Sequence, residues 1–140
     1  MYDPALMDRT TASRTRQYTL DEARALVPGI RGVLLQLAVE RRRHTAAQAA
    51  LAVLDRQPGA HDGNARERHE REMDAAREAI GALLAHLEEL GVQLRDAESG
   101  LVDIPTRRDG EPAWFCWRLA DPELAYWHTT REGFASRRPL

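Results

Sequence analysis

Two long stretches of helical periodicity, separated by one short segment, constrain the fold of this 140-residue chain most strongly. In the first stretch, apolar residues recur three and four positions apart from Ala23 to Leu37. In the second, the same spacing runs from Met73 to Leu90. The segment 57–64 between them is rich in Pro, Gly and Asn, which is a turn signal. Because a short loop joins helices in an antiparallel pair, the sequence predicts a long helical hairpin.

The ends of both predicted helices carry capping signals. Thr19-Leu20-Asp21-Glu22 is a capping box, in which the side chains of Thr19 and Glu22 satisfy each other's backbone amides. Pro28 lies inside the first pattern and is expected to bend the helix near its second turn. The periodicity resumes at once, so we predict one bent helix that runs to about Arg56. Gly91 stands where a glycine typically ends the second helix.

After Gly91 the period of the apolar residues changes to two, which indicates strands. Two apolar runs, Leu101 to Pro105 and Trp114 to Leu119, flank Asp109-Gly110, a strong signal for a tight hairpin turn. A further strand is expected from Leu124 to His128. The predicted fold class is therefore α+β: a long antiparallel helical hairpin followed by a small antiparallel β meander.

The predicted domain organisation is simple. Residues 1–17 are expected to form a flexible N-terminal tail, and 18–140 a single domain. Within this domain, 18–90 form the helical hairpin and 91–140 the β-rich module. The last ten residues, 131–140, are expected to be irregular.

Charge and composition narrow the function classes. The chain has 20 basic and 22 acidic residues, and every basic residue is an arginine. Without lysine there is no Schiff-base chemistry and no Walker-type phosphate loop. Because there is no basic excess, nucleic acid is not expected as a partner. The single cysteine, Cys116, excludes an intrachain disulfide. No signal peptide and no membrane-length apolar run is recognised, so we expect a cytoplasmic protein without a membrane span.

The helical hairpin carries more small and apolar residues than one hairpin can bury. Alanines gather on both helices: Ala46, Ala47, Ala49, Ala50 and Ala52 on the first, and Ala75, Ala76, Ala79 and Ala82 on the second. Small residues allow helices to approach closely, and two hairpins can pair as a four-helix bundle. We therefore expect a homodimer through the helical hairpin. The alternative is that the β module alone covers the exposed stripe.

The β module has two different faces. If Asp109-Gly110 is the centre of the hairpin, Asp103 lies opposite Cys116 and Val102 opposite Trp117. Alternate side chains of a strand share a face. The apolar face, expected to pack on the helices, collects Val102, Ile104, Phe115, Trp117, Leu119, Ala125 and Trp127. The other face collects Asp103, Trp114, Cys116, Arg118, Tyr126 and His128.

This second face has two interpretations. It is either an ordinary solvated sheet face or a ligand-binding site formed by Asp103, Cys116, Arg118, Tyr126 and His128. Three of these, His128, Asp103 and Cys116, have side chains that bind divalent metal ions. A nucleophilic Cys116–His128 pair is a weaker hypothesis, since it requires a lowered thiol pKa. His128 is the best single candidate for function. Its structural alternative is a hydrogen bond to a backbone carbonyl of the C-terminal segment.

Several short motifs resemble an uncharacterised bacterial family, domain-of-unknown-function family 2203. They are Tyr18-Thr19-Leu20-Asp21-Glu22-Ala23 with Leu26-Val27-Pro28, Gly91-Val92, Gly100-Leu101-Val102-Asp103-Ile104-Pro105, Cys116-Trp117-Arg118-Leu119, Tyr126-Trp127-His128, Gly133-Phe134 and Arg138-Pro139-Leu140. The resemblance implies a similar fold and implies no activity or cofactor. The chain departs from the family pattern at Ala120-Asp121, where Gly-Glu is more typical, and at Ser136, where glycine is.

Two hypotheses follow from the sequence. In the first, the protein binds a divalent metal ion or another small ligand at the polar face of the β module, and whether it is an enzyme stays open. In the second, it is a structural or protein-interaction module without a ligand site.

Overall fold

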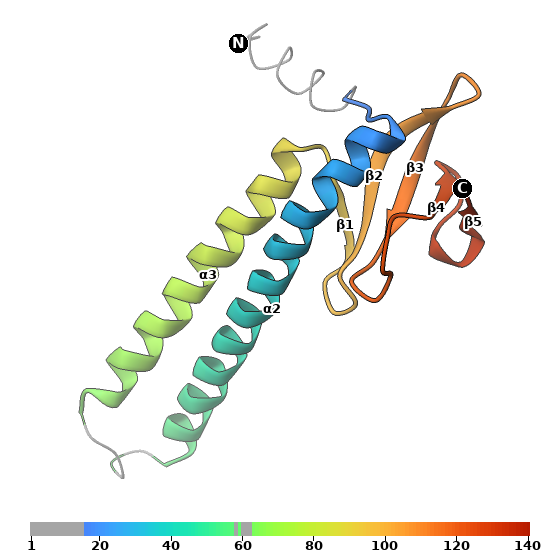
Figure 1. Cartoon of the computed structure of the whole chain (residues 1–140). Helices are drawn as coiled ribbons and strands as arrows, with labels where there is room; N and C mark the ends of the chain where they lie inside the picture. Colours follow the sequence, from blue (N-terminus) through green and yellow to red (C-terminus); the bar gives the residue numbers. More distant parts are fainter. Residues whose placement is uncertain (1–15, 58, 60–62) are drawn as a thin grey trace, which may run out of the picture. The chain divides into compact units, whose positions relative to one another are not determined.

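A computed structural model describes residues 16–57, 59 and 63–140 of the chain. Two helices, α2 (Leu20–Arg56) and α3 (Ala65–Glu89), lie side by side and antiparallel, and a five-stranded antiparallel sheet follows them in the chain (Figure 1). The predicted α+β class, with a helical hairpin and a β meander, is confirmed. The predicted tail lies outside the described residues, apart from Arg16 and Gln17. None of the helices in the described part of the chain has the length and apolar character needed to cross a membrane.

Both helix caps form as the sequence predicts. The backbone amide of Thr19 donates to Glu22 Oε1 at 2.9 Å, and the amide of Glu22 donates to Thr19 Oγ1 at 3.2 Å. At the end of α3, Gly91 has a φ of 76°. Its left-handed backbone lets the Val92 amide reach the Leu87 carbonyl at 3.0 Å, which is the Schellman arrangement. Pro28 lies inside α2, which continues unbroken to Arg56.

The sheet has its strands in sequence order, and they are β1 (Gln93–Asp96), β2 (Leu101–Arg108), β3 (Glu111–Trp117), β4 (Tyr126–Thr129) and β5 (Arg138–Pro139). The predicted register is confirmed, because Asp103 pairs with Cys116 and Val102 with Trp117. The hairpin turn has φ values of 52° at Asp109 and 81° at Gly110. Positive φ at both central residues is the requirement of a tight type I′ hairpin turn.

Three details of the β module differ from the prediction. β2 and β3 extend to Arg108 and Glu111, because a two-residue turn keeps the strands paired up to its ends. The third predicted strand begins at Tyr126 and not at Leu124, whose side chain is buried in the core. The segment 131–140 is not irregular: it forms a short 3₁₀ helix, η1 (Phe134–Ser136), and then β5.

The described residues belong to two compact units, and the helices contribute to both. One unit contains 16–34 and 85–140, including the whole sheet. Its core is formed by one face of the sheet, by helix residues and by three residues of the connecting segments of the same unit: Tyr18, Ala23, Ile30, Leu34, Leu87, Val92, Val102, Ile104, Phe115, Trp117 and Leu124. Trp117 is fully buried, as predicted, whereas Trp127 is half-buried and packs against this cluster.

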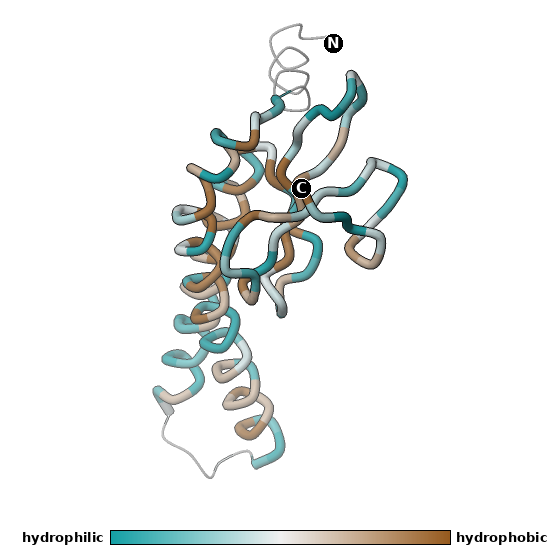
Figure 2. The backbone as a smooth tube through the Cα atoms, turned by 45° about the vertical axis from the view of Figure 1, so that its right-hand side comes forward, coloured by the Kyte–Doolittle hydropathy of each residue, from teal (hydrophilic) through white to brown (hydrophobic). Residues whose placement is uncertain are grey.

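The other unit, Leu35–Leu84, is made only of the helical hairpin. Leu37, Ala47, Ala65 and Ala76 are buried in it, and an ion pair of 2.6 Å joins Asp55 of α2 to Arg66 of α3. Four larger apolar side chains remain exposed: Leu35, Val39, Val53 and Leu84. The helices in Figure 2 accordingly alternate between hydrophobic and hydrophilic residues along their length.

Candidate metal centre

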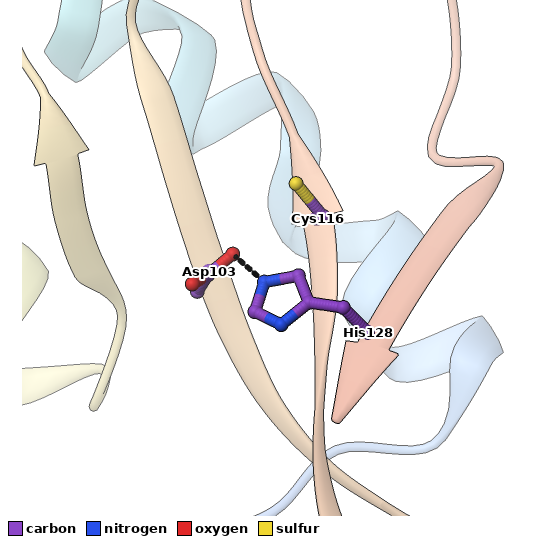
Figure 3. A group of neighbouring side chains, drawn as sticks. All are labelled: Asp103, Cys116 and His128. Atoms are coloured by element: carbon purple, nitrogen blue, oxygen red, sulfur yellow. Dashed lines mark hydrogen bonds and ion pairs between the residues drawn. The ribbon is translucent and has the colours of Figure 1, made fainter. Parts of the chain in front are cut away.

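Three neighbouring strands bring a carboxylate, a thiol and an imidazole together on one face of the sheet. Asp103 on β2 pairs directly with Cys116 on β3. His128 on β4 pairs with Trp114, two residues before Cys116, and therefore shares the face of Cys116. One ligand atom from each of Asp103, Cys116 and His128 lies within 4.8 Å of the other two. Figure 3 shows the Cys116 sulfur and the Asp103–His128 pair on adjacent strands.

All three side chains are shielded from solvent. The exposed fractions are 3% for Asp103, 1% for Cys116 and 2% for His128. One interpretation of the sequence was that this sheet face is solvated. At these three positions solvent is excluded. Burial of ionisable groups costs free energy unless they are paired, so their partners decide what the cluster can do.

Both ring nitrogens of His128 have a partner. Nδ1 lies 2.8 Å from the backbone carbonyl oxygen of Thr129, and Nε2 lies 2.9 Å from Asp103 Oδ1. A carbonyl oxygen only accepts, so Nδ1 carries a proton and donates it to Thr129. The ring is thus held in one orientation, with Nε2 directed at the cluster (Figure 3).

The second oxygen of Asp103 is held from the opposite side. Arg95 on β1 donates from Nε to Asp103 Oδ2 at 2.9 Å. The Arg95 guanidinium also lies over the Trp114 ring, 5.1 Å from its centroid. Asp103 therefore bridges a guanidinium and an imidazole, which fixes the position of its carboxylate.

Burial determines the protonation state of Cys116. Removal from water, reinforced by the negative charge of Asp103, raises the pKa of the thiol to about 11. The Arg137 guanidinium beside it lowers this pKa, but by less than burial raises it. The thiol is therefore protonated at neutral pH. A nucleophilic cysteine requires the opposite change, so the geometry argues against the Cys116–His128 nucleophile.

A comparison with known protein families gives a match that includes all three cluster residues. The family described as "Uncharacterized conserved protein (DUF2203)" matches residues 16–140. The chain belongs to this family. No curated protein and no solved structure matches it. The resemblance seen in the short motifs is thereby confirmed.

The other two predicted site residues of this DUF2203 chain, Tyr126 and Arg118, are placed differently. Tyr126 pairs with Cys116 across the strands, and the Arg137 guanidinium lies 4.0 Å from the centroid of its ring. Arg118 is directed elsewhere: its Nε lies 3.7 Å from Asp121 Oδ1, and its guanidinium lies over the Phe134 ring. Of the five predicted ligand-binding residues, Asp103, Cys116 and His128 form the donor cluster.

Two arginines near the cluster were not predicted from the sequence: Arg95, which contacts Asp103, and Arg137. Arg137 reaches Cys116 from the segment between η1 and β5, and its side chain donates to both oxygens of Asp121 at 2.7 and 3.2 Å. Burial would raise the pKa of Asp121, but the hydrogen bonds from Arg137 and from the Arg118 amide lower it below its ordinary value. Asp121 thus anchors the C-terminal segment.

Proposed function

We propose that this protein binds a divalent metal ion of the zinc class through Asp103, Cys116 and His128. The observation that carries the proposal is the cluster of three different metal-binding side chains, all buried, with donor atoms within 4.8 Å of one another. Carboxylate oxygen, thiolate sulfur and imidazole nitrogen are the donors that zinc accepts in proteins. A free cysteine among the ligands suits the reducing cytoplasm, where we place the protein.

The geometry of the cluster is near that of a metal site. Around a tetrahedral Zn²⁺, ligand atoms lie about 3.3–3.8 Å apart, given metal–ligand bonds of about 2.0–2.3 Å. A small rotation of the three side chains would bring donors now within 4.8 Å to that separation. Three protein ligands leave a fourth position for water or a substrate, which is the arrangement of catalytic zinc sites.

The partners around the cluster support the same proposal. A histidine that binds a metal through one ring nitrogen typically donates its other N–H to a carbonyl or carboxylate. In His128 this second partner is the Thr129 carbonyl, which leaves Nε2 on the side of Asp103 and Cys116. The His128 carbonyl contact is therefore within β4, and not with the C-terminal segment as its structural alternative assumed. Arg95 holds the carboxylate in the same way.

The metal proposal is tested by the metal content of purified protein. We expect about one equivalent of zinc per chain in the wild type and none in Cys116→Ser or His128→Asn, measured by elemental analysis after incubation with Zn²⁺ and desalting. His128→Asn should remain folded and, compared without metal, lose about 1 kcal/mol, because asparagine retains a hydrogen-bond donor. Zinc should raise the melting temperature of the wild type but not of Cys116→Ser or His128→Asn, since it binds only a folded chain with an intact site.

The matched control is His86→Asn, which removes an exposed histidine of α3 outside the cluster. It should bind as much zinc as the wild type. Equal zinc in all four proteins, or no zinc in the wild type, would show that the cluster is a structural hydrogen-bond network.

We also propose that two copies of the chain associate through α2. Within the unit Leu35–Leu84, α2 has an exposed stripe whose residues are spaced alternately four and three positions apart. Its members are Leu35, Val39, Arg42, Ala46, Ala49 and Val53, of which only Arg42 is charged. By helical geometry this stripe is on the opposite side of α2 from buried Leu37 and Ala47. An antiparallel pairing centred near residue 44 sets Leu35 against Val53 and Arg42 against Ala46, whose small side chain leaves room for the arginine stem.

The association is tested by sedimentation at micromolar concentration. We expect a dimer for the wild type and a monomer for Val39→Glu, since a buried unpaired carboxylate opposes association. Gln36→Glu adds the same charge at another exposed position of α2, about a quarter of a turn from the stripe, and should leave the dimer intact. A monomeric wild type would refute the proposal, as would a dimeric Val39→Glu.

A further inference from the structure

A groove of about 450 Å³ lies in the unit that carries the sheet, on the opposite sheet face from the metal centre. It is lined by Phe115 of β3 and Trp127 of β4, whose side chains alternate with those of Cys116 and His128. The segment that leads into α2, the end of β2 and Leu140 form the other walls. Its volume falls in the range of sites for small organic ligands, about 300–1,000 Å³.

The walls of the groove are largely apolar and held in place by the core. Tyr18 and Phe115 are 8% and 6% exposed and belong to the buried cluster, and Leu20 and Trp127 pack against it. The Tyr18 hydroxyl donates to the Leu90 carbonyl at 2.6 Å, and Thr106 Oγ1 donates to the Tyr18 carbonyl at 2.7 Å. The aromatic surface is therefore rigid before any ligand arrives, which lowers the entropic cost of binding.

The charged side chains that line the groove are two adjacent arginines. Arg107 donates to two neutral acceptors, Gln17 Oε1 at 3.1 Å and the Gly110 carbonyl at 2.5 Å. Arg108 lies over the Trp127 ring, 4.2 Å from its centroid. Neither guanidinium forms an ion pair with a carboxylate of the described residues, whereas Arg95, Arg137 and Arg138 of the same unit each do.

We infer that this groove binds a small amphipathic anion, namely a carboxylate with a flat apolar body. Arg108 shares the sheet face of Phe115 and Trp127, and its guanidinium supplies the parallel N–H donors that match a carboxylate. Arg107, which also lines the groove, adds a second positive charge, and the aromatic walls match a flat ring. The site is independent of the metal centre, because it uses the other face of the sheet and shares no residue with it.

The inference is tested by calorimetric titration with naphthalene-2-carboxylate and its neutral isostere, naphthalene-2-carboxamide, in the presence of a chelator. The chain should bind one carboxylate per copy, at least about tenfold more tightly than the carboxamide. In Arg107→Gln/Arg108→Gln, the carboxylate should lose this advantage and bind like the carboxamide. Arg131→Gln removes an exposed arginine that does not line the groove and should bind like the wild type.

Each result decides the inference. Saturable carboxylate binding that depends on Arg107 and Arg108 supports it. No saturable binding by the wild type, equal affinity for acid and amide, or an unchanged double variant would each overturn it. The two arginines are exposed, so circular dichroism should show that their variant is folded. Because chelator is present throughout, the result does not depend on whether the metal centre binds zinc.

Discussion

Replacing Trp117 by alanine is expected to lower the free energy of unfolding by about 3–5 kcal/mol, the usual cost of deleting a buried tryptophan. Trp117 is fully buried at the centre of the core, between Val102 of the neighbouring strand and the Arg31 guanidinium, which lies 5.0 Å from its ring. The cavity would open beneath the same strands that position Asp103 and Cys116. The variant is therefore expected to be largely insoluble or to melt far below the wild type, as measured by chemical and thermal denaturation.

Two further variants show whether the loss comes from packing. Trp117→Phe keeps most of the aromatic area and removes a buried indole N–H that has no hydrogen-bond partner among the described residues, so it should cost much less. Trp127→Ala removes a half-buried ring at the edge of the core and should also cost less than Trp117→Ala. A soluble Trp117→Ala protein with an unchanged melting temperature would contradict the assignment of this sheet face to the core.

The sequence was sufficient to predict the hairpin of β2 and β3 because its signals are local. Asp109-Gly110 determines the turn, the turn determines the register, and the register places Asp103 opposite Cys116. The alternation of side chains along a strand then placed His128 on the same face as Cys116, and β4 pairs with β3 in the expected orientation. Three of the candidate site residues could thus be brought together without any long-range information.

The other features of the fold and of the site depend on contacts between distant residues, which local sequence patterns do not reveal. β5 has only two residues, one of them a proline, and it exists because Ala125 and β4 provide partners for it. Arg137 reaches Cys116 only because Asp121, sixteen positions earlier, holds its guanidinium. Strand alternation placed Arg118 on the same sheet face as the site. In the structure its side chain instead contacts the Asp121 carboxylate and the Phe134 ring.

Zinc binding at the proposed centre is expected to release a proton from Cys116. Burial raises the pKa of this thiol to about 11, so it is protonated at neutral pH and must become a thiolate to bind the metal. Because this proton is displaced at neutral pH, zinc affinity should rise with pH by up to about tenfold per unit.

The proton count is measured by calorimetric titration of the metal-free chain with Zn²⁺ at one pH in buffers of different ionisation enthalpy. The dependence of the observed heat on the buffer gives the number of protons released. Cys116→Ser should release one fewer, because serine does not supply a thiol proton, and bind more weakly. His86→Asn should behave like the wild type. Zinc held by exposed histidines would give the same proton count and the same affinity in Cys116→Ser as in the wild type. That result would locate the metal outside the buried cluster and contradict the assignment of Asp103, Cys116 and His128 as its ligands.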